Sequence, residues 1–305
     1  MKSLTFFFSG SCALFYLFRT LLFVGAWCVV FEVMNRIDAV FARRGAQGEG
    51  RAFVAYLTAG DPDAEASLKV MQTVSECGVD ILEVGIPFSD PIADGPVIQA
   101  AFGRALAAGM AVDGVFELVR KLRAKSEMAL VLFTYFNPVL QYGVERFAKG
   151  AKAAGADGVL ILDLPVEASS AERSIFKSHG LHWVVLVAPT TPPERARRLA
   201  EGAGGFVYYV SREGVTGERA NLAEGLREKV RELKSFSPMP VCVGFGVSNR
   251  DHVREICSVA DGVVVGSAIV RQVEKANASG SDPATAVKDF LVPLVHEAHN
   301  QGIVR

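Results

Sequence analysis

The 305-residue sequence has almost no net charge. Its 32 lysines and arginines nearly match its 33 aspartates and glutamates, which leaves a formal net charge of −1. No block of like charge is long enough to form a tail or to attract nucleic acid. Half of the residues are hydrophobic, which is typical of an ordinary globular chain and not of a disordered one. We therefore expect small molecules, and no nucleic acid, as ligands.

The sequence is also poor in patterns that bind metal or form disulfides. Its five cysteines are widely spaced and none belongs to a CxxC pair, so neither a zinc site nor a disulfide framework is indicated. The five histidines are scattered as well, and the close pairs His179/His182 and His296/His299 lack a third ligand. We expect no metal, and a reducing cytoplasm is the simplest location.

One long apolar segment, Leu4 to Val33, stands apart from the rest of the chain. Its longest clean run, Leu21 to Phe31, is shorter than the roughly 20 residues that a membrane-spanning helix needs, and Arg19 would lie near mid-membrane. No small-x-small cleavage site of a signal peptide follows it. We favour a native start at Met34, with residues 1–33 as an apolar extension outside the native protein; a membrane anchor or signal peptide is the alternative.

From Arg36 onward, short apolar runs alternate with helical stretches at a period near 30 residues, which is typical of a parallel sheet. The runs show no polar alternation, so each strand should be buried on both faces. Eight such runs predict an α/β fold, a (β/α)₈ TIM barrel, as a single catalytic domain over residues 34–305. A short helix at Ile37 to Arg43 should cover the N-terminal mouth. The runs are Phe53–Thr58, Ile81–Val84, Ala129–Phe133, Gly158–Leu162, Trp183–Val187, Phe206–Val210, Val241–Val243 and Gly262–Val265.

In such barrels the loops after the strands build the active site. Glu83 ends the second apolar run, where burial would raise its pKa toward values suited to proton transfer at neutral pH. A buried salt bridge to a neighbouring strand is the alternative for this residue. Asp94 follows on a loop that prolines stiffen and glycines shape, which should deliver its side chain to the same place. Ser89, Asp90 and Asp94 could also serve only as turn and cap residues, and for Ser89 this is the better explanation.

Two glycine turns follow successive strands near the C-terminus. Gly244-Phe245-Gly246 follows the seventh run, and Gly266-Ser267-Ala268 follows the eighth and opens into a short helix at Ile269 to Val273. Glycine lets backbone amides approach an anion, and a helix N-terminus adds partial positive charge. These two loops are often the phosphate site of such barrels. Tight turns without a ligand are the alternative.

The polar loop Ser211 to Gly217, after the sixth run, is suited to be a mobile lid, although a plain exposed connection would look the same. Tyr208 and Tyr209, just before it, must point to opposite faces of the strand. Their spacing alone does not decide which of the two points inward.

Several of these stretches together resemble one family, the α subunits of tryptophan synthase, which are indole-3-glycerol-phosphate lyases. The resemblance covers about Asn35 to Asn300, and the first motif is highly specific in order and spacing. The motifs are LEVGIPFSDPIADGP at Leu82–Pro96, TAGDP at Thr58–Pro62, SREGVTG at Ser211–Gly217, GFGVS at Gly244–Ser248 and VGSAIV at Val265–Val270.

The resemblance implies a retro-aldol cleavage of indole-3-glycerol phosphate to indole and glyceraldehyde 3-phosphate. Glu83 would be the general acid/base, Asp94 would accept a hydrogen bond from the indole N–H, and Tyr208 would be the active-site tyrosine. No metal or cofactor is implied in this subunit. Substrate binding would fall to Tyr56, Phe133, Leu160 and Phe245 around the indole, to Thr216 of the lid, and to the main chain of Gly217, Gly246, Gly266 and Ser267 around the phosphate.

The family's partner is a pyridoxal-phosphate β subunit, which receives indole through a tunnel in an α₂β₂ tetramer. The resemblance implies that the loop around Pro87 to Asp90 faces this partner. A stand-alone indole-releasing lyase and a catalytically weak scaffold that mainly activates the β subunit are the alternative functions.

Overall fold

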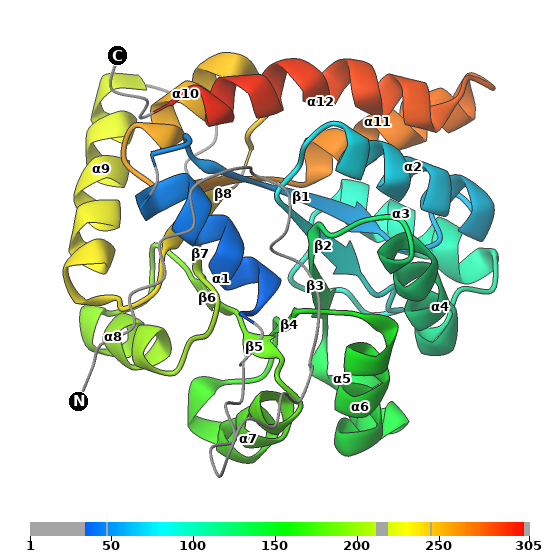
Figure 1. Cartoon of the computed structure of the whole chain (residues 1–305), viewed down its shortest axis with the longest axis horizontal. Coiled ribbons are helices and arrows are strands. Elements are labelled where there is room, and N and C mark those ends of the chain that lie inside the picture. The colour runs from blue at the N-terminus through cyan, green and yellow to red at the C-terminus, as the bar shows by residue number, and fades with distance from the viewer. Residues whose placement is uncertain (1–33, 47, 212–218, 245, 302–305) are drawn as a thin grey trace, which may run out of the picture. The chain divides into compact units, whose positions relative to one another are not determined.

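The computed structural model of the chain describes residues 34–46, 48–211, 219–244 and 246–301. Strands and helices alternate along this part of the chain, and the strands surround a common centre with the helices outside (Figure 1). The strands are β1 Ala52–Thr58, β2 Ile81–Gly85, β3 Ala129–Thr134, β4 Gly158–Ile161, β5 His182–Trp183, β6 Val185–Val187, β7 Val207–Val210, β8 Val241–Gly244 and β9 Gly262–Val265.

All pairings among these strands are parallel, in the order β5-β4-β3-β2-β1-β9-β8-β7-β6. The two end segments, β5 and β6, are separated in the chain only by Val184, whose amide donates a hydrogen bond to the carbonyl of Val159 at 2.9 Å. The fifth predicted strand is therefore one stretch that is split in two. Its halves pair with opposite ends of the sheet and close the predicted (β/α)₈ barrel.

Every residue of β1, β2 and β3 is buried. Successive side chains point alternately inside and outside the barrel. Phe53 and Ala55 of β1 belong to the cluster under the helices, whereas Val54 and Tyr56 belong to the cluster inside the barrel. Because both faces are covered, the strands lack the polar alternation of a half-exposed sheet.

One helix differs from its expected range. α11 spans 12 residues and is longer than the short helix predicted at Ile269 to Val273. The helices are α1 Arg36–Phe41, the π-helix η1 Ala42–Ala46, α2 Ala64–Glu76, α3 Pro96–Ala107, α4 Val112–Arg123, α5 Phe136–Tyr142, α6 Val144–Ala154, the 3₁₀ helix η2 Val166–Ala168, α7 Ser170–Ser178, α8 Pro193–Glu201, α9 Arg219–Phe236, α10 Arg250–Cys257, α11 Ser267–Ala278 and α12 Pro283–His299.

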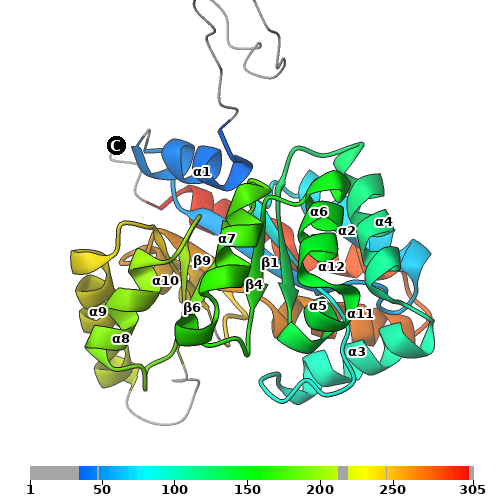
Figure 2. The same ribbon diagram turned by 90° about the horizontal axis from the view of Figure 1, so that it is seen from below.

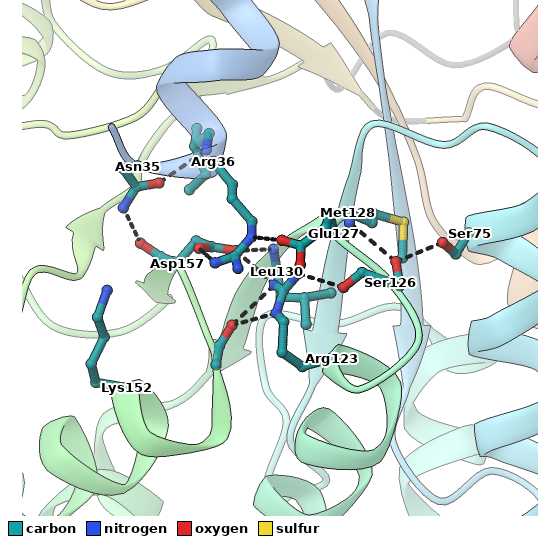
Figure 3. Close-up of polar contacts among 12 residues, drawn as sticks. Asn35, Arg36, Ser75, Arg123, Ser126, Glu127, Met128, Leu130, Lys152 and Asp157 are labelled. Atoms are coloured by element: carbon teal, nitrogen blue, oxygen red, sulfur yellow. Dashed lines mark hydrogen bonds and ion pairs between the residues drawn. The ribbon is translucent and has the colours of Figure 1, made fainter. Parts of the chain in front are cut away.

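α1 covers the N-terminal end of the barrel, as expected. Its Ile37 is fully buried in the inner cluster. Arg36 donates to Asp157 Oδ1 at 3.1 Å, and Asn35 donates to the Asp157 carbonyl at 2.9 Å (Figure 3). Figure 2 shows α1 at one end of the barrel and α3 at the other. The carboxyl ends of the strands are thus left for a site at the end opposite α1.

Three aspartates organise the same N-terminal end; Asp80 and Asp157 are buried, and Asp261 is partly buried. Each accepts a hydrogen bond of 2.9 Å from a backbone amide of a neighbouring strand, which fixes where that strand enters the barrel. The pairs are Asp80 with the Phe53 amide, Asp157 with the Leu130 amide, and Asp261 with the Val241 amide.

In the described part of the chain, no helix is both long enough and apolar enough to cross a membrane. The apolar segment Leu4 to Val33 lies outside the described residues.

Candidate active site

Glu83 is the third residue of β2, in register with Tyr56 of β1 and Val131 of β3. Its side chain is buried, with 1 % exposed, and its Oε1 atom has no hydrogen-bond partner. Burial raises the pKa of Glu83 to about 8. No salt bridge joins it to any described residue. A carboxyl group in this state holds its proton at neutral pH and has a free oxygen with which to exchange it.

Asp94 lies in the loop between β2 and α3, directly before Gly95, which caps α3. Its Oδ2 accepts a hydrogen bond of 2.6 Å from the hydroxyl of Tyr135, and the same hydroxyl accepts one of 3.0 Å from the Ala93 amide. Burial raises the pKa of Asp94, and the hydrogen bond from Tyr135 opposes that shift. Tyr135 therefore fixes both the backbone and the side chain of this part of the loop.

The two tyrosines of β7 separate as the alternation requires. Tyr208 packs with the cluster inside the barrel, and Tyr209 is buried in the cluster under the helices. The pKa of Tyr208 is raised by burial and then by the negative charge of Glu83. The inward residue is thus Tyr208, which shares the barrel interior with Glu83.

Tyr56 brings a hydroxyl group to the expected indole site. Its Oη lies 3.4 Å from Thr58 Oγ1. Burial raises the pKa of this hydroxyl, and the charges of Asp94 and Glu83 add to the shift. The Tyr56 ring also meets Phe133 edge-on, with centroids 5.1 Å apart. Both carboxylates therefore lie within electrostatic range of one side chain.

Of the other residues predicted to surround the indole or to belong to the lid, one is buried in the barrel and three lie outside the described residues. Leu160 is fully buried in the inner cluster with Phe133. The residues Phe245, Thr216 and Gly217 lie outside the described part of the chain.

The second glycine turn lies against the predicted indole wall. Gly266 is the N-cap of α11, and Ser267 is the first residue of that helix. A Cβ atom at Gly266 would lie 3.4 Å from the Tyr56 Cβ, so the start of α11 adjoins the Tyr56 side chain. The N-terminus of α11 at Ser267 is suited to bind an anion. In the other glycine turn, which follows β8, Gly246 has φ +70°, a conformation that favours glycine.

The described residues contain no group of three or more His, Cys, Asp or Glu side chains arranged to hold a metal ion. His179, His182 and His299 each contact a single carboxylate, namely those of Glu145, Asp38 and Asp80.

Sequence reasoning missed Tyr135, which is 1 % exposed and follows the last residue of β3. A polar residue at a strand's carboxyl end was the signal that could have found it. It also missed Asp61, the acidic residue of the TAGDP stretch, which is buried and accepts two hydrogen bonds from Arg104.

A groove lies beside the loop that carries Asp94. Its volume is about 290 Å³, and it includes the exposed apolar side chains of Ile92 and Leu106, which are 87 % and 39 % exposed. The other lining residues are Phe88, Ser89, Asp90, Pro91, Gln99 and Gly103.

Comparison with known proteins gives a consistent answer. The family model of the tryptophan synthase alpha chain matches residues 41–299. The chain belongs to the tryptophan synthase alpha chain family. It is 48% identical over 242 residues to the tryptophan synthase alpha chain of Opitutus terrae, covering 79% of this chain and 91% of the relative. It is 46% identical over 261 residues to that of Desulfatibacillum aliphaticivorans, covering 86% and 98%.

The fold agrees with the same family. The crystal structure of tryptophan synthase subunit alpha from Legionella pneumophila superposes with a TM-score of 0.82 at 36% identity, covering 88% of this chain and 99% of that one. The resemblance inferred from the motifs is therefore confirmed at the level of family and fold.

Proposed function

We propose that this chain is the α subunit of tryptophan synthase and that it cleaves indole-3-glycerol phosphate to indole and glyceraldehyde 3-phosphate. One observation carries the proposal: in a chain of this family, Glu83 of β2 is buried inside the barrel with a pKa of about 8 and an unpartnered oxygen. A carbon–carbon lyase of the aldolase type needs such a group, because it must both give and take a proton.

Glu83 acts in two steps. It first donates its proton to C3 of the indole ring, which leaves the ring nitrogen positively charged. The carboxylate that results then takes the proton of the hydroxyl on the carbon attached to C3. As that O–H bond breaks, a carbonyl forms, the carbon–carbon bond breaks, and its electrons return to the ring to give indole. Glu83 ends the cycle protonated, as it began.

Asp94 stabilises the charge that develops between these steps. Its carboxylate accepts a hydrogen bond from the indole N–H, and its negative charge stabilises the cationic ring. The hydrogen bond from Tyr135 supports this role, because it holds the carboxylate in one orientation and opposes the rise in its pKa. Tyr208 lies in the same interior and would contact the reacting chain of the substrate.

The phosphate is proposed to bind to backbone amides of Gly217, Gly246, Gly266 and Ser267. The capping position of Gly266 at the start of α11 supports this assignment. Tyr56, Phe133, Leu160 and Phe245 would surround the indole, and Thr216 would close over it from the lid. The subunit would need no metal or cofactor of its own.

The proposed partner is a tryptophan synthase β subunit that carries pyridoxal phosphate, in a cytoplasmic α₂β₂ tetramer. The groove beside Phe88 and Ile92 supports this proposal, because exposed apolar side chains next to a catalytic loop are typical of an interaction surface. The β subunit would receive indole and use it to make L-tryptophan.

The proposal is tested by measuring both products from indole-3-glycerol phosphate, with and without the β subunit. We expect equimolar indole and glyceraldehyde 3-phosphate, with a clear rate increase when the partner is added. An equal rate without the partner would favour the stand-alone lyase. Activation of the partner without any product from this chain would favour the scaffold.

A further inference from the structure

Two helices of the barrel begin at opposite ends of the proposed substrate. α3 starts at Pro96, directly after Asp94 and Gly95, and so begins beside the proposed indole site. α11 starts at Ser267 and so begins at the proposed phosphate site. The two helices are neighbours and pack against each other (Figure 2). Their relative position therefore sets the distance between the two ends of the site.

Asp94 is tied to α3 by more than the peptide chain. Gln99, in the first turn and a half of the helix, donates hydrogen bonds to the Asp94 carbonyl at 2.9 Å and to the Pro91 carbonyl at 3.3 Å. The loop and α3 should therefore move together as one rigid unit. A shift of the helix would move the Asp94 carboxylate with it.

Arg104 joins α3 to α11. Its Nη1 donates to Glu274 Oε1 of α11 at 3.2 Å. Among the described residues, this is the only ion pair between the two helices.

Arg104 is also anchored to the barrel itself. Its Nε and Nη2 donate to the two carboxylate oxygens of Asp61 at 2.7 and 2.9 Å. The Asp61 side chain is 3 % exposed, and the Asp61 amide donates to the Thr58 carbonyl, the last residue of β1, at 3.4 Å. A bidentate pair of this kind fixes the guanidinium in both distance and plane. Arg104 therefore holds both helices in fixed positions relative to the carboxyl end of β1.

We propose that Arg104, through Asp61 and Glu274, is a positioning residue that sets the distance between the indole end and the phosphate end of the active site. This inference rests on the proposed function. A ligand that spans both ends gains affinity only when the two sites are held at the matching distance, whereas a ligand that fills one end does not depend on that distance. The inference therefore concerns spanning ligands and not fragments.

The test compares dissociation constants of three probes on the full chain. The spanning probe is an indole joined by a three-carbon chain to a phosphate, which cannot be cleaved. The fragment probes are indole and glycerol 3-phosphate. For Arg104→Met we expect at least tenfold weaker binding of the spanning probe, with both fragments changed less than twofold. Arg104→Lys should restore part of the loss.

Arg36 provides a matched control at the opposite end of the barrel. It donates to the buried Asp157 at 3.1 Å and to the exposed Glu127 at 2.7 Å, which is the same pattern of one buried and one exposed acid (Figure 3). Arg36→Met should leave all three dissociation constants within twofold of wild type. A loss of spanning-probe binding in Arg36→Met as large as that in Arg104→Met would overturn the inference.

Glu274→Ala is the milder variant, because the Glu274 side chain is 39 % exposed and the Asp61 pair stays intact. It should weaken the spanning probe at least threefold and leave the fragments unchanged. The inference is wrong if folded Arg104→Met or Glu274→Ala binds the spanning probe like wild type, or if fragments and spanning probe weaken equally. Failure of the proposed function would look different, because the wild type itself would not bind the spanning probe.

Discussion

The hydroxyl of Tyr135 donates a 2.6 Å hydrogen bond to Asp94 Oδ2 and accepts one of 3.0 Å from the Ala93 amide. A single side chain thereby holds the backbone and the carboxylate of the loop on which the proposed indole contact depends. A hydrogen bond to a charged group, such as the one from Tyr135 to Asp94, contributes about 1.5–3 kcal/mol to stability.

Tyr135→Phe should lower kcat/KM for indole-3-glycerol phosphate by about tenfold or more, because the Asp94 carboxylate loses its orientation. The pKa of Asp94 should also rise, since the hydrogen bond from Tyr135 opposes the effect of burial. Steady-state kinetics measure the first effect. Tyr142→Phe is the control, because Tyr142 donates a similar hydrogen bond to Asp113 on the exterior, and its loss should leave kcat/KM unchanged. Equal kinetics of Tyr135→Phe and wild type would refute the positioning role.

The raised pKa of Glu83 has a consequence for stability. Between about pH 4.5 and 8 the unfolded chain has this carboxyl ionised while the folded chain keeps it protonated. The contribution of Glu83 to the free energy of unfolding is therefore fully present below about pH 4.5 and is lost as the pH rises toward 8.

Glu83→Gln removes this dependence, because an amide needs no proton to stay neutral. Relative to wild type, the variant should gain up to about 1.4 kcal/mol of unfolding free energy per pH unit across that window. Denaturant unfolding at pH 5 and at pH 8 measures the difference. Glu65→Gln, at an exposed position in the first turn of α2, should show no such trend. A pH-independent difference between Glu83→Gln and wild type would mean that Glu83 ionises normally.

Gly85 ends β2 against the ring of Tyr56. A Cβ atom there would lie 2.2 Å from Tyr56 Oη, so Gly85→Ala must displace that ring or the strand. We expect a loss of about 1–3 kcal/mol in stability together with weaker indole binding. Gly103→Ala is the contrasting change, since its Cβ would meet nothing within 4 Å in the interior of α3. That variant should gain about 0.5–1 kcal/mol, and unfolding curves for the two should shift in opposite directions.

A substitution of Asp80 tests whether the N-terminal end of the barrel contributes to stability and not to catalysis. Its buried carboxylate accepts from the Phe53 amide at 2.9 Å and pairs with Arg43 and Arg44 at 2.8 and 2.9 Å. Burial acts to raise the pKa of Asp80, but the hydrogen bond and charge of His299 and the charge of Arg44 outweigh it and lower that pKa. The stabilisation is therefore present above about pH 4 and is lost as the pH falls through the lowered pKa.

Asp80→Asn should cost about 3–5 kcal/mol of unfolding free energy near pH 7, because the arginines lose their buried counter-charge. The kcat of the folded variant should stay within twofold of wild type, since the substitution lies at the end opposite the proposed site. Thermal or denaturant unfolding and steady-state kinetics check both expectations. A stable variant with lost turnover would contradict this division between the two ends of the barrel.

The fold was largely predictable because the apolar runs that become strands are buried on both sides. Eight runs without polar alternation leave few architectures other than a closed parallel barrel. The split of the fifth strand at Val184 was not predictable, because the sequence stays apolar through it and the break depends on which neighbour each half pairs with. The full length of α11 was missed for a related reason: its first turn looked like part of a glycine loop.

The site was predictable only in part. Glu83 could be singled out because a lone carboxylate in an apolar run is uncommon; the structure shows it buried, and its catalytic role stays a proposal. Tyr135 and Arg104 could not be singled out, because each matters through a partner far away in the sequence, Asp94 and Asp61 respectively. Alternation along β7 gave two opposite faces without saying which one is inside; the family resemblance pointed to Tyr208, and Tyr208 does pack with the cluster inside the barrel.

The central claim is that Glu83 transfers the protons of the cleavage. The most direct test is indole formation from indole-3-glycerol phosphate by wild type and Glu83→Gln, both saturated with the β subunit. Loss of a positioned acid/base should lower turnover by about 100-fold or more. Folded Glu83→Gln that retained wild-type turnover would contradict the account.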